Sequence, residues 1–298
     1  MRFDSYHPTI NMIYFTAAIL MPIISHHPVF LLIGYLSAFL YSVKLGGLRT
    51  LVFDLCLIPL TGLYAGIYAG YHHFGVTDLG QNLIGNSITW ESLVYGWMIG
   101  VTIATELMLF SCVFRIVSSD KIGYLLGRVS PKLSLFLAIL LRSVPRIRQQ
   151  AAAINTVQCG IGRGINQGST FQRLRNLLRV FSITITWALE NFVESATSMK
   201  SRGYLLSGRT AFSIYRFDNR DRAYVLLLTL CLVLLAMAIL LDQTAVSYDP
   251  VIVVNRITGM SYIFYAACAV LYLSPLALQL FGEVKYRLHT NPHFYGKM

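Results

Sequence analysis

Long apolar stretches dominate this sequence. A helix needs about 20 predominantly apolar residues to cross the hydrocarbon core of a bilayer. Only 12% of the residues are charged, against roughly a quarter in soluble domains, and the mean hydropathy is +0.59. We therefore exclude a soluble globular fold and predict an all-α integral membrane protein with about six transmembrane helices. The apolar stretches cover 10–24, 28–43, 51–71, 91–114, 223–241 and 258–281.

Lys and Arg are distributed unevenly among the segments between these stretches. Basic loops resist translocation and stay in the cytoplasm. If both termini are cytoplasmic, 23 of the 24 Lys and Arg residues lie on the cytoplasmic side, and only Arg256 lies outside. Seventeen of them fall in one segment. We expect a multi-pass protein of the plasma membrane with N-terminal membrane helices in 1–114, a cytoplasmic helical module in 115–222, and C-terminal membrane helices with a cytoplasmic tail in 223–298.

Apolar residues recur at helical spacing through the cytoplasmic module. One pattern predicts a helix over 146–163 that stops at Gly164, and another predicts a helix over 171–202 that stops at Gly203. The second helix has apolar residues at alternating steps of four and three, which is typical of a seam that packs against another helix. The seam residues are Leu174, Leu178, Phe181, Ile185, Ala188, Phe192 and Met199.

Both predicted helices end in an Arg followed by a Gly, in Gly162-Arg163-Gly164 and Ser201-Arg202-Gly203. A Gly just past the last turn takes the left-handed conformation that closes a helix at little cost. The Arg cation is favoured by the partial negative charge of the helix C-terminus, and its guanidinium suits bidentate bonding to a carboxylate. One such end is usually only a helix cap, but two in one basic module indicate a pair of binding tips.

Further short motifs accompany these tips between about 114 and 221. They are Ser119-Asp120-Lys121, a Leu141–Pro145 turn and Arg209-Thr210. In their order and spacing, these motifs resemble the transmembrane T component of energy-coupling factor (ECF) type ABC transporters. In that family two X-Arg-Gly tips, where X is commonly Ala, end coupling helices that dock on two ATPase subunits.

The resemblance implies a function and a set of partners. The chain would be the non-catalytic coupling subunit of an importer for a vitamin or a metal ion. Its partners would be two ECF ATPase subunits, a small substrate-binding (S) membrane subunit and the lipid bilayer. The ATPase-coupling residues would be Gly162, Arg163, Gly164, Ser201, Arg202 and Gly203.

The sequence lacks the common motifs for catalysis. It contains no GxxxxGK[ST] loop for nucleotide phosphates, no HExxH and no GxSxG. We therefore expect no enzyme activity, cofactor or metal site in this chain, and no nucleic-acid partner. Two alternatives stay open: a permease that forms its own substrate path, and an ATP-independent membrane scaffold or secondary carrier.

Three features of the predicted spans allow more than one interpretation. Glu106 lies inside the fourth span. Its carboxyl is either a proton site or a structural hydrogen-bonding group, and we favour the structural role. The pairs His26-His27 and His72-His73 are interfacial histidines or, with lower weight, a metal-capture site. Small residues recur on two helices and form either internal contacts or a docking face for a membrane partner. They are Gly62, Gly66 and Gly70 on one helix and Gly96, Gly100 and Ala104 on the next.

Overall fold

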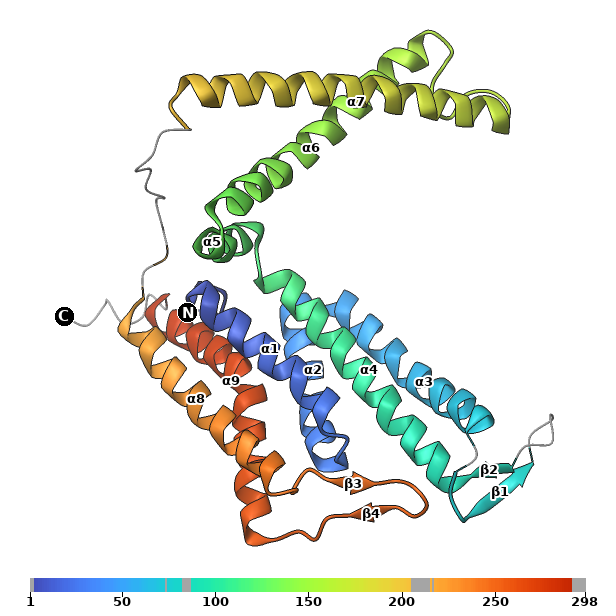
Figure 1. The fold of residues 1–298 in the computed structure, drawn as a ribbon, viewed down its shortest axis with the longest axis vertical. Coiled ribbons are helices and arrows are strands. Elements are labelled where there is room, and N and C mark those ends of the chain that lie inside the picture. Colours follow the sequence, from blue (N-terminus) through green and yellow to red (C-terminus); the bar gives the residue numbers. More distant parts are fainter. Residues whose placement is uncertain (1–2, 73, 82–86, 205–214, 216, 291–298) are drawn as a thin grey trace. The chain divides into compact units, whose positions relative to one another are not determined.

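The structure is a computed structural model that describes residues 3–72, 74–81, 87–204, 215 and 217–290. The chain is helical, with two short hairpins of β-strand (Figure 1). In chain order the elements are η1 (Phe3–Ser5), α1 (Pro8–Ile24), α2 (Pro28–Gly46), α3 (Leu48–Tyr71), β1 (Asp78–Gln81), β2 (Ser87–Thr89), α4 (Trp90–Ile116), α5 (Ser119–Val129), α6 (Pro131–Gly160), α7 (Thr170–Ser201), α8 (Asn219–Leu240), β3 (Val246–Ser247), β4 (Val253–Val254) and α9 (Gly259–Thr290).

The predicted fold class is confirmed. Five of the described helices, α2, α3, α4, α8 and α9, are long and apolar enough to cross a membrane. A sixth apolar helix, α1, is shorter, with 17 residues, as expected for the short first span. The protein is therefore an all-α, multi-pass membrane protein.

The chain divides into two compact units. Residues 1–118 together with 215–298 form the first, which we call the membrane unit because it contains the six apolar helices. Residues 119–214 form the second, which we call the α5–α7 unit. The two units are described separately below.

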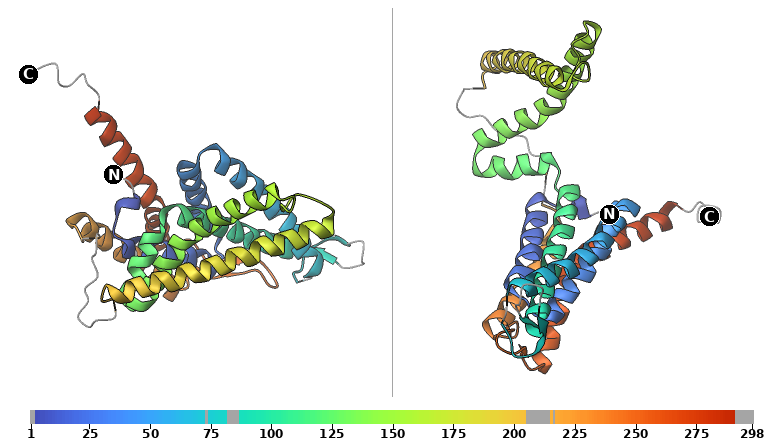
Figure 2. Two further views of the ribbon diagram at one scale, coloured as in Figure 1. Left: turned by 90° about the horizontal axis from the view of Figure 1, so that it is seen from above. Right: turned by 90° about the vertical axis from the view of Figure 1, so that its right-hand side faces the viewer.

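In the membrane unit, α4 packs on α1, α2 and α3, while α9 packs on α2 and α8 (Figures 1 and 2). Two buried tyrosines tie α1 to α9, because the Tyr272 hydroxyl donates to the Ala18 carbonyl at 2.8 Å and the Tyr14 hydroxyl to the Tyr272 carbonyl at 3.4 Å. Such interhelical bonds add specificity where lipid offers no hydrophobic force between helices.

The glycines of α4 explain why it lies so close to α3. A Cβ atom at Gly96 would stand 3.1 Å from the Ala65 Cα, and one at Gly100 would stand 3.0 Å from the Thr61 carbonyl oxygen. On α3, by contrast, nothing lies within 4 Å of a Cβ at Gly62 or Gly66. The interpretation as internal packing is therefore confirmed for these α4 glycines, whereas Gly62 and Gly66 are open to the outside.

Each β-hairpin joins the ends of two membrane helices. The strands β1 and β2 pair antiparallel between α3 and α4, and β3 and β4 pair antiparallel between α8 and α9. Near the first hairpin the buried Glu91 carboxyl accepts from the Thr77 backbone N–H at 3.3 Å. This bond fixes the loop against the first turn of α4.

In the α5–α7 unit, α6 and α7 form a helical hairpin and α5 packs on α6 (Figures 1 and 2). The Ser134 hydroxyl donates to the Gly123 carbonyl at 2.7 Å and so joins α5 to α6. The helix α7 begins in a capping box, in which Ser169 and Gln172 satisfy each other's backbone N–H groups.

The predicted turn at Leu141–Pro145 is wrong, because α6 continues through Pro145 for a total of 30 residues. Proline removes one backbone donor and usually ends a helix. The donor that Pro145 lacks would pair with the Leu141 carbonyl, and the Ser143 hydroxyl donates one residue earlier, to the Leu140 carbonyl at 2.8 Å. The helix predicted over 146–163 is the second half of this longer helix.

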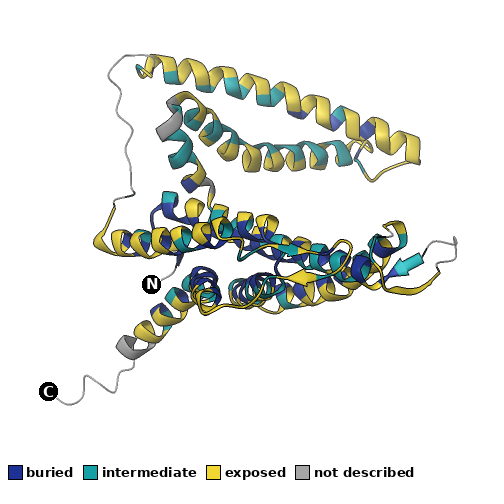
Figure 3. Ribbon diagram, turned by 60° about the horizontal axis from the view of Figure 1, so that its bottom comes forward, coloured by how far each residue is buried: buried dark blue, intermediate teal, exposed yellow. Residues whose placement is uncertain are grey.

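The seam predicted on α7 is not the face that packs on α6. The buried residues of α7 are Asn176, Val180 and Thr184, which are spaced four apart on one face. The seam residues Leu178 and Phe181 are 57% and 59% exposed, and Figure 3 shows how much of α7 is exposed. Periodicity identified an apolar face, but the buried face of α7 is a narrower one that combines Val180 with the polar Asn176 and Thr184.

The close contact between α3 and α4 can be tested by adding the same side chain at two glycines. Gly100→Val pushes against the α3 backbone, and we expect overpacking to cost about 1–3 kcal/mol of folding free energy. Gly62→Val is the matched control, since it adds the same side chain in a transmembrane helix at an open position. Thermal unfolding in detergent should show a lower melting temperature for Gly100→Val only; equal effects would contradict the packing argument.

Candidate functional site: two arginine-bearing helix ends

The helix α6 ends in a Schellman motif, in which two backbone bonds close the last turn. Gly162 has a φ angle of 77°. Its N–H donates to the Cys159 carbonyl at 3.1 Å, and the Arg163 N–H donates to the Gln158 carbonyl at 2.9 Å. Arg163 therefore comes directly after the left-handed glycine, and its backbone N–H is part of the cap.

The helix α7 ends in the same motif, but its left-handed glycine follows the arginine instead of preceding it. Here Gly203 is the left-handed residue, with a φ angle of 76°. The Gly203 N–H donates to the Lys200 carbonyl at 3.1 Å, and the Tyr204 N–H donates to the Met199 carbonyl at 3.2 Å. Arg202 therefore precedes the left-handed glycine and is the C-cap residue itself.

The expectation that both helices stop in the same way is therefore wrong in one respect. At the end of α6 the left-handed glycine is Gly162, and Gly164 has another role. A Cβ atom on the buried Gly164 would stand 3.2 Å from the Cys159 Cα and would overlap its Sγ atom. Close packing against Cys159 thus requires a glycine at position 164, and the left-handed φ angle favours a glycine at position 162.

The loop between α6 and α7 is held by side-chain amides. The Ile165 N–H donates to the Asn155 Oδ1 atom at 3.1 Å, and the Gly164 N–H donates to the Gln167 Oε1 atom at 2.9 Å. The buried Asn176 Nδ2 atom donates to the Gly164 carbonyl at 3.0 Å. Sequence reasoning missed these three amides, and the charged and polar residues around Asn176 on α7 gave no signal for its role.

The six predicted coupling residues thus lie at the two ends of one helical hairpin. The side chains of Arg163, Ser201 and Arg202 are exposed. The ion pairs found in the described part of the chain, Lys44–Glu283 and Arg220–Asp218, involve neither tip arginine. Arg209 and Thr210 lie outside the described residues. Each tip can therefore present a cation, on a closed helix end, to an anionic group of another molecule.

An apolar groove of about 350 Å³ lies beside the contact between α6 and α7. On α6 it is lined by Ile147, Arg148 and Ala151, and on α7 by residues that include Phe181 and Ile185. Part of the seam predicted on α7 therefore lines a groove of the α5–α7 unit.

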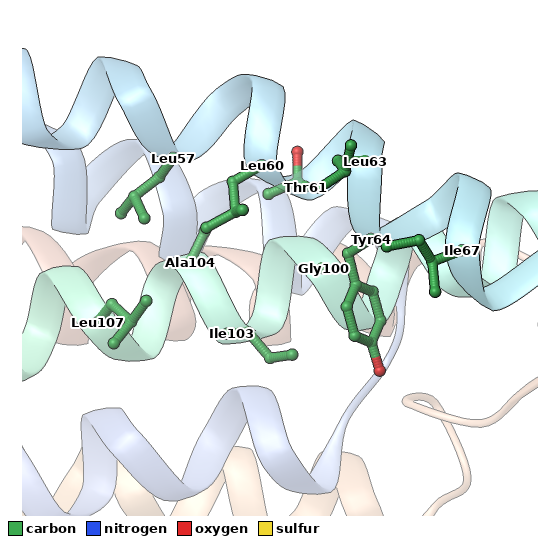
Figure 4. A pocket seen from close by; sticks show the side chains of 10 residues that line it. All are labelled: Leu57, Leu60, Thr61, Leu63, Tyr64, Ile67, Gly100, Ile103, Ala104 and Leu107. Atoms are coloured by element: carbon green, nitrogen blue, oxygen red, sulfur yellow. The ribbon is translucent and has the colours of Figure 1, made fainter.

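A second groove, of about 250 Å³, lies between α3 and α4 in the membrane unit (Figure 4). Its lining is apolar apart from Thr61 and Tyr64, and it includes Gly100 and Leu107. None of the lining residues carries a charge. Because both helices are candidate spans, a groove of this chemistry suits an acyl chain or an apolar helix better than an ion.

Glu106 and the described histidines of the two pairs have different surroundings. Both Glu106 carboxyl oxygens are buried without a hydrogen-bond partner among the described residues, so the expected structural hydrogen bond is not found there.

His27 is the N-cap of α2, because its Nδ1 atom accepts from the Val29 N–H at 3.3 Å. Burial lowers the pKa of His26 and His27, which favours their neutral forms. His73 lies outside the described residues.

Comparison with known proteins gives one partial match. No protein-family model matches the sequence. A segment of 91 residues is 29% identical to the "energy-coupling factor transporter transmembrane protein EcfT" of Bacillus selenitireducens. The match covers 30% of this chain and spans about a third, 34%, of that relative. It supports a membrane component of a transporter and fits a non-catalytic subunit that works in a membrane complex.

The left-handed glycines can be tested through local stability. Gly162→Ala forces an L-residue into a left-handed conformation, which costs roughly 1–2 kcal/mol. Gly160→Ala is the matched control, since Gly160 is helical with nothing within 4 Å of its Cβ position, and alanine favours the helix there. In hydrogen–deuterium exchange of the purified protein, amides in 155–165 should exchange faster in Gly162→Ala and no faster in Gly160→Ala. Unchanged exchange in Gly162→Ala would contradict the assignment.

Proposed function

We propose that this protein is the transmembrane coupling subunit of an ECF-type ABC importer. It transmits the ATP-driven motion of two ATPase subunits to a small substrate-binding membrane subunit. The imported substrate is a vitamin or a metal ion, and both termini of the chain are cytoplasmic. The partial similarity to the EcfT protein supports this proposal, as does the charge distribution of the loops.

The observation that carries the proposal is the pair of closed helix ends. Arg163 and Arg202 are exposed cations, each next to a glycine whose φ angle closes the helix. A Schellman cap leaves the end of a helix with satisfied carbonyls and a defined direction. A force applied at either arginine therefore acts on a rigid helix of 30 or 32 residues, which is what mechanical coupling requires.

The open apolar face of α7 supports assembly with another protein. Leu174, Leu178, Phe181 and Leu189 are between 55% and 60% exposed. α7 is not among the candidate membrane spans, so lipid does not account for this face in the way it does for α2 or α8. Contiguous exposed apolar surface of this kind marks an interaction site, and a membrane subunit with an apolar exterior fits it.

One observation favours a second candidate function, a secondary carrier that works without ATP. The Glu106 carboxyl lies inside a candidate span with both oxygens buried and unpaired among the described residues. Ionisable groups inside a membrane are functional candidates by default, and a proton-coupled carrier would use such a carboxyl. A scaffold without transport activity belongs to the same ATP-independent alternative.

Affinity purification of the tagged protein from its native membrane in mild detergent distinguishes these functions. Mass spectrometry should identify two ATPase subunits and a small hydrophobic protein. That protein then defines the substrate to be used in uptake assays. A chain that purifies without ATPases at every detergent strength would favour the carrier or scaffold.

The tip arginines can be tested in the same preparation. Truncating an arginine that is buried against a carboxylate costs about 2–5 kcal/mol, so Arg163→Ala and Arg202→Ala should each weaken ATPase binding roughly 30-fold to a few thousandfold. Uptake into proteoliposomes should fall accordingly. Arg142→Ala, another exposed arginine of α6, is the control and should retain binding and uptake. Normal assembly and transport in both tip variants would refute the coupling role.

A further inference from the structure

The two helix ends differ in the charge of their surroundings. From position 121 to position 189 the sequence contains ten Lys and Arg residues and no Asp or Glu. The end of α6 and the start of α7 lie inside this acid-free segment. The end of α7 lies beyond it, after Glu190 and Glu194. The chain therefore surrounds its two tip arginines with unequal electric fields.

At the α6 end, three exposed arginines occur within a short segment. They are Arg163, Arg173 and Arg175, which give 157–175 a formal charge of +3 because this segment has no acid. Arg173 is fixed against the same loop as Arg163, since its Nε atom donates to the Gly168 carbonyl at 3.1 Å. We call this group the α6-end basic patch.

Apolar side chains flank the α6-end basic patch. Val157 is 64% exposed and Ile161 is 63% exposed, in the last turn of α6 and at its C-cap. A surface that buries this end must therefore supply negative charge together with apolar contact. This segment has no acid, and the ion pairs found among the described residues do not involve the patch, so its arginines are available to anionic groups of another molecule.

At the α7 end, the charges cancel. Glu190 and Glu194 offset Lys200 and Arg202, so that 190–204 has a formal charge of zero, and all four side chains are exposed. Of the other side chains near this end, Thr197, Ser198 and Ser201 are polar and exposed, while Met199 is half-buried and Tyr204 is 38% exposed. The Thr197 hydroxyl donates to the Glu194 carbonyl at 2.9 Å and the Ser201 hydroxyl to the Ser198 carbonyl at 2.9 Å.

We propose that the two ends bind chemically different ATPase surfaces. The α6 end fits a strongly acidic surface with an apolar rim, and the α7 end fits a polar surface of mixed charge. This inference rests on the proposed function, and it adds the chemistry of each socket. Charges on the rim of an interface mainly set the association rate and its salt dependence, and salt screens exposed charges beyond about 10 Å at 0.1 M. Salt therefore weakens the α6 contact more than the α7 contact.

The test compares charge removal at the two ends, with the ATPase subunits that co-purify with the protein as the probe. The variants are Arg173→Gln with Arg175→Gln at the α6 end, and Lys200→Gln at the α7 end. Lys132→Gln with Arg142→Gln is the matched control, because it removes two exposed charges from the start and middle of α6. The dissociation constant for ATPase binding is measured at low salt, where exposed charges interact strongly, and at high salt, where they are screened.

The α6-end double variant should weaken ATPase binding about 2- to 30-fold at low salt, as expected for two exposed ion pairs. It should also reduce the dependence of binding on salt. Lys200→Gln and the control double variant should leave both quantities close to those of the unchanged protein. This pattern would support two different sockets.

Other outcomes would overturn the inference. If Lys200→Gln lowers affinity and salt dependence as much as the α6-end double variant does, the sockets are equivalent and only this inference fails. If the α6-end variant keeps its affinity for the ATPases but loses binding to vesicles with anionic lipid, the basic patch binds membrane instead. If no ATPase co-purifies at any salt concentration, the proposed function fails, and this inference fails with it.

Discussion

Lipid cannot hydrogen-bond to the polypeptide backbone, and the architecture of the membrane unit follows from this constraint. Each N–H and C=O group inside the hydrocarbon must find a partner within the protein, so the spanning segments are helices. Helices surrounded by lipid gain no hydrophobic force by associating. They associate through close backbone approach, as at Gly96 and Gly100 on α4, and through buried hydroxyls such as those of Tyr14 and Tyr272.

The same constraint separates the α5–α7 unit from the apolar helices. An arginine in the middle of a bilayer is costly, and α6 and α7 together carry six. The ends of these helices are closed by backbone hydrogen bonds, by side-chain amides and by glycines in the left-handed conformation. Their exposed surface combines cations with apolar strips, a combination that soluble monomers rarely show over large areas and that protein partners can cover.

The sequence was sufficient to predict the class of fold and the positions of the spans, because hydropathy over about 20 residues reports directly on lipid exposure. It was also sufficient to place the C-terminal ends of α6 and α7 within a few residues. It was not sufficient for the contacts between helices. The seam on α7 was predicted from apolar periodicity, whereas the contact with α6 uses Asn176, Val180 and Thr184, which depend on three-dimensional packing. The turn predicted at Pro145 failed because a long helix can tolerate one missing donor.

The glycine assignment shows most clearly what a short motif leaves undecided. In Gly162-Arg163-Gly164 either glycine can take the left-handed conformation, and only the bonds to Gln158 and Cys159 select Gly162. In Ser201-Arg202-Gly203 a single glycine is present, and it follows the arginine. As a result Arg163 begins the loop while Arg202 ends the helix. The backbone N–H of Arg163 donates to the Gln158 carbonyl as part of the cap, whereas the backbone N–H of Arg202 donates to the Ser198 carbonyl at 3.3 Å. Two segments that look equivalent in sequence thus project their cations from different backbone positions, and a partner that binds both must provide two differently shaped surfaces.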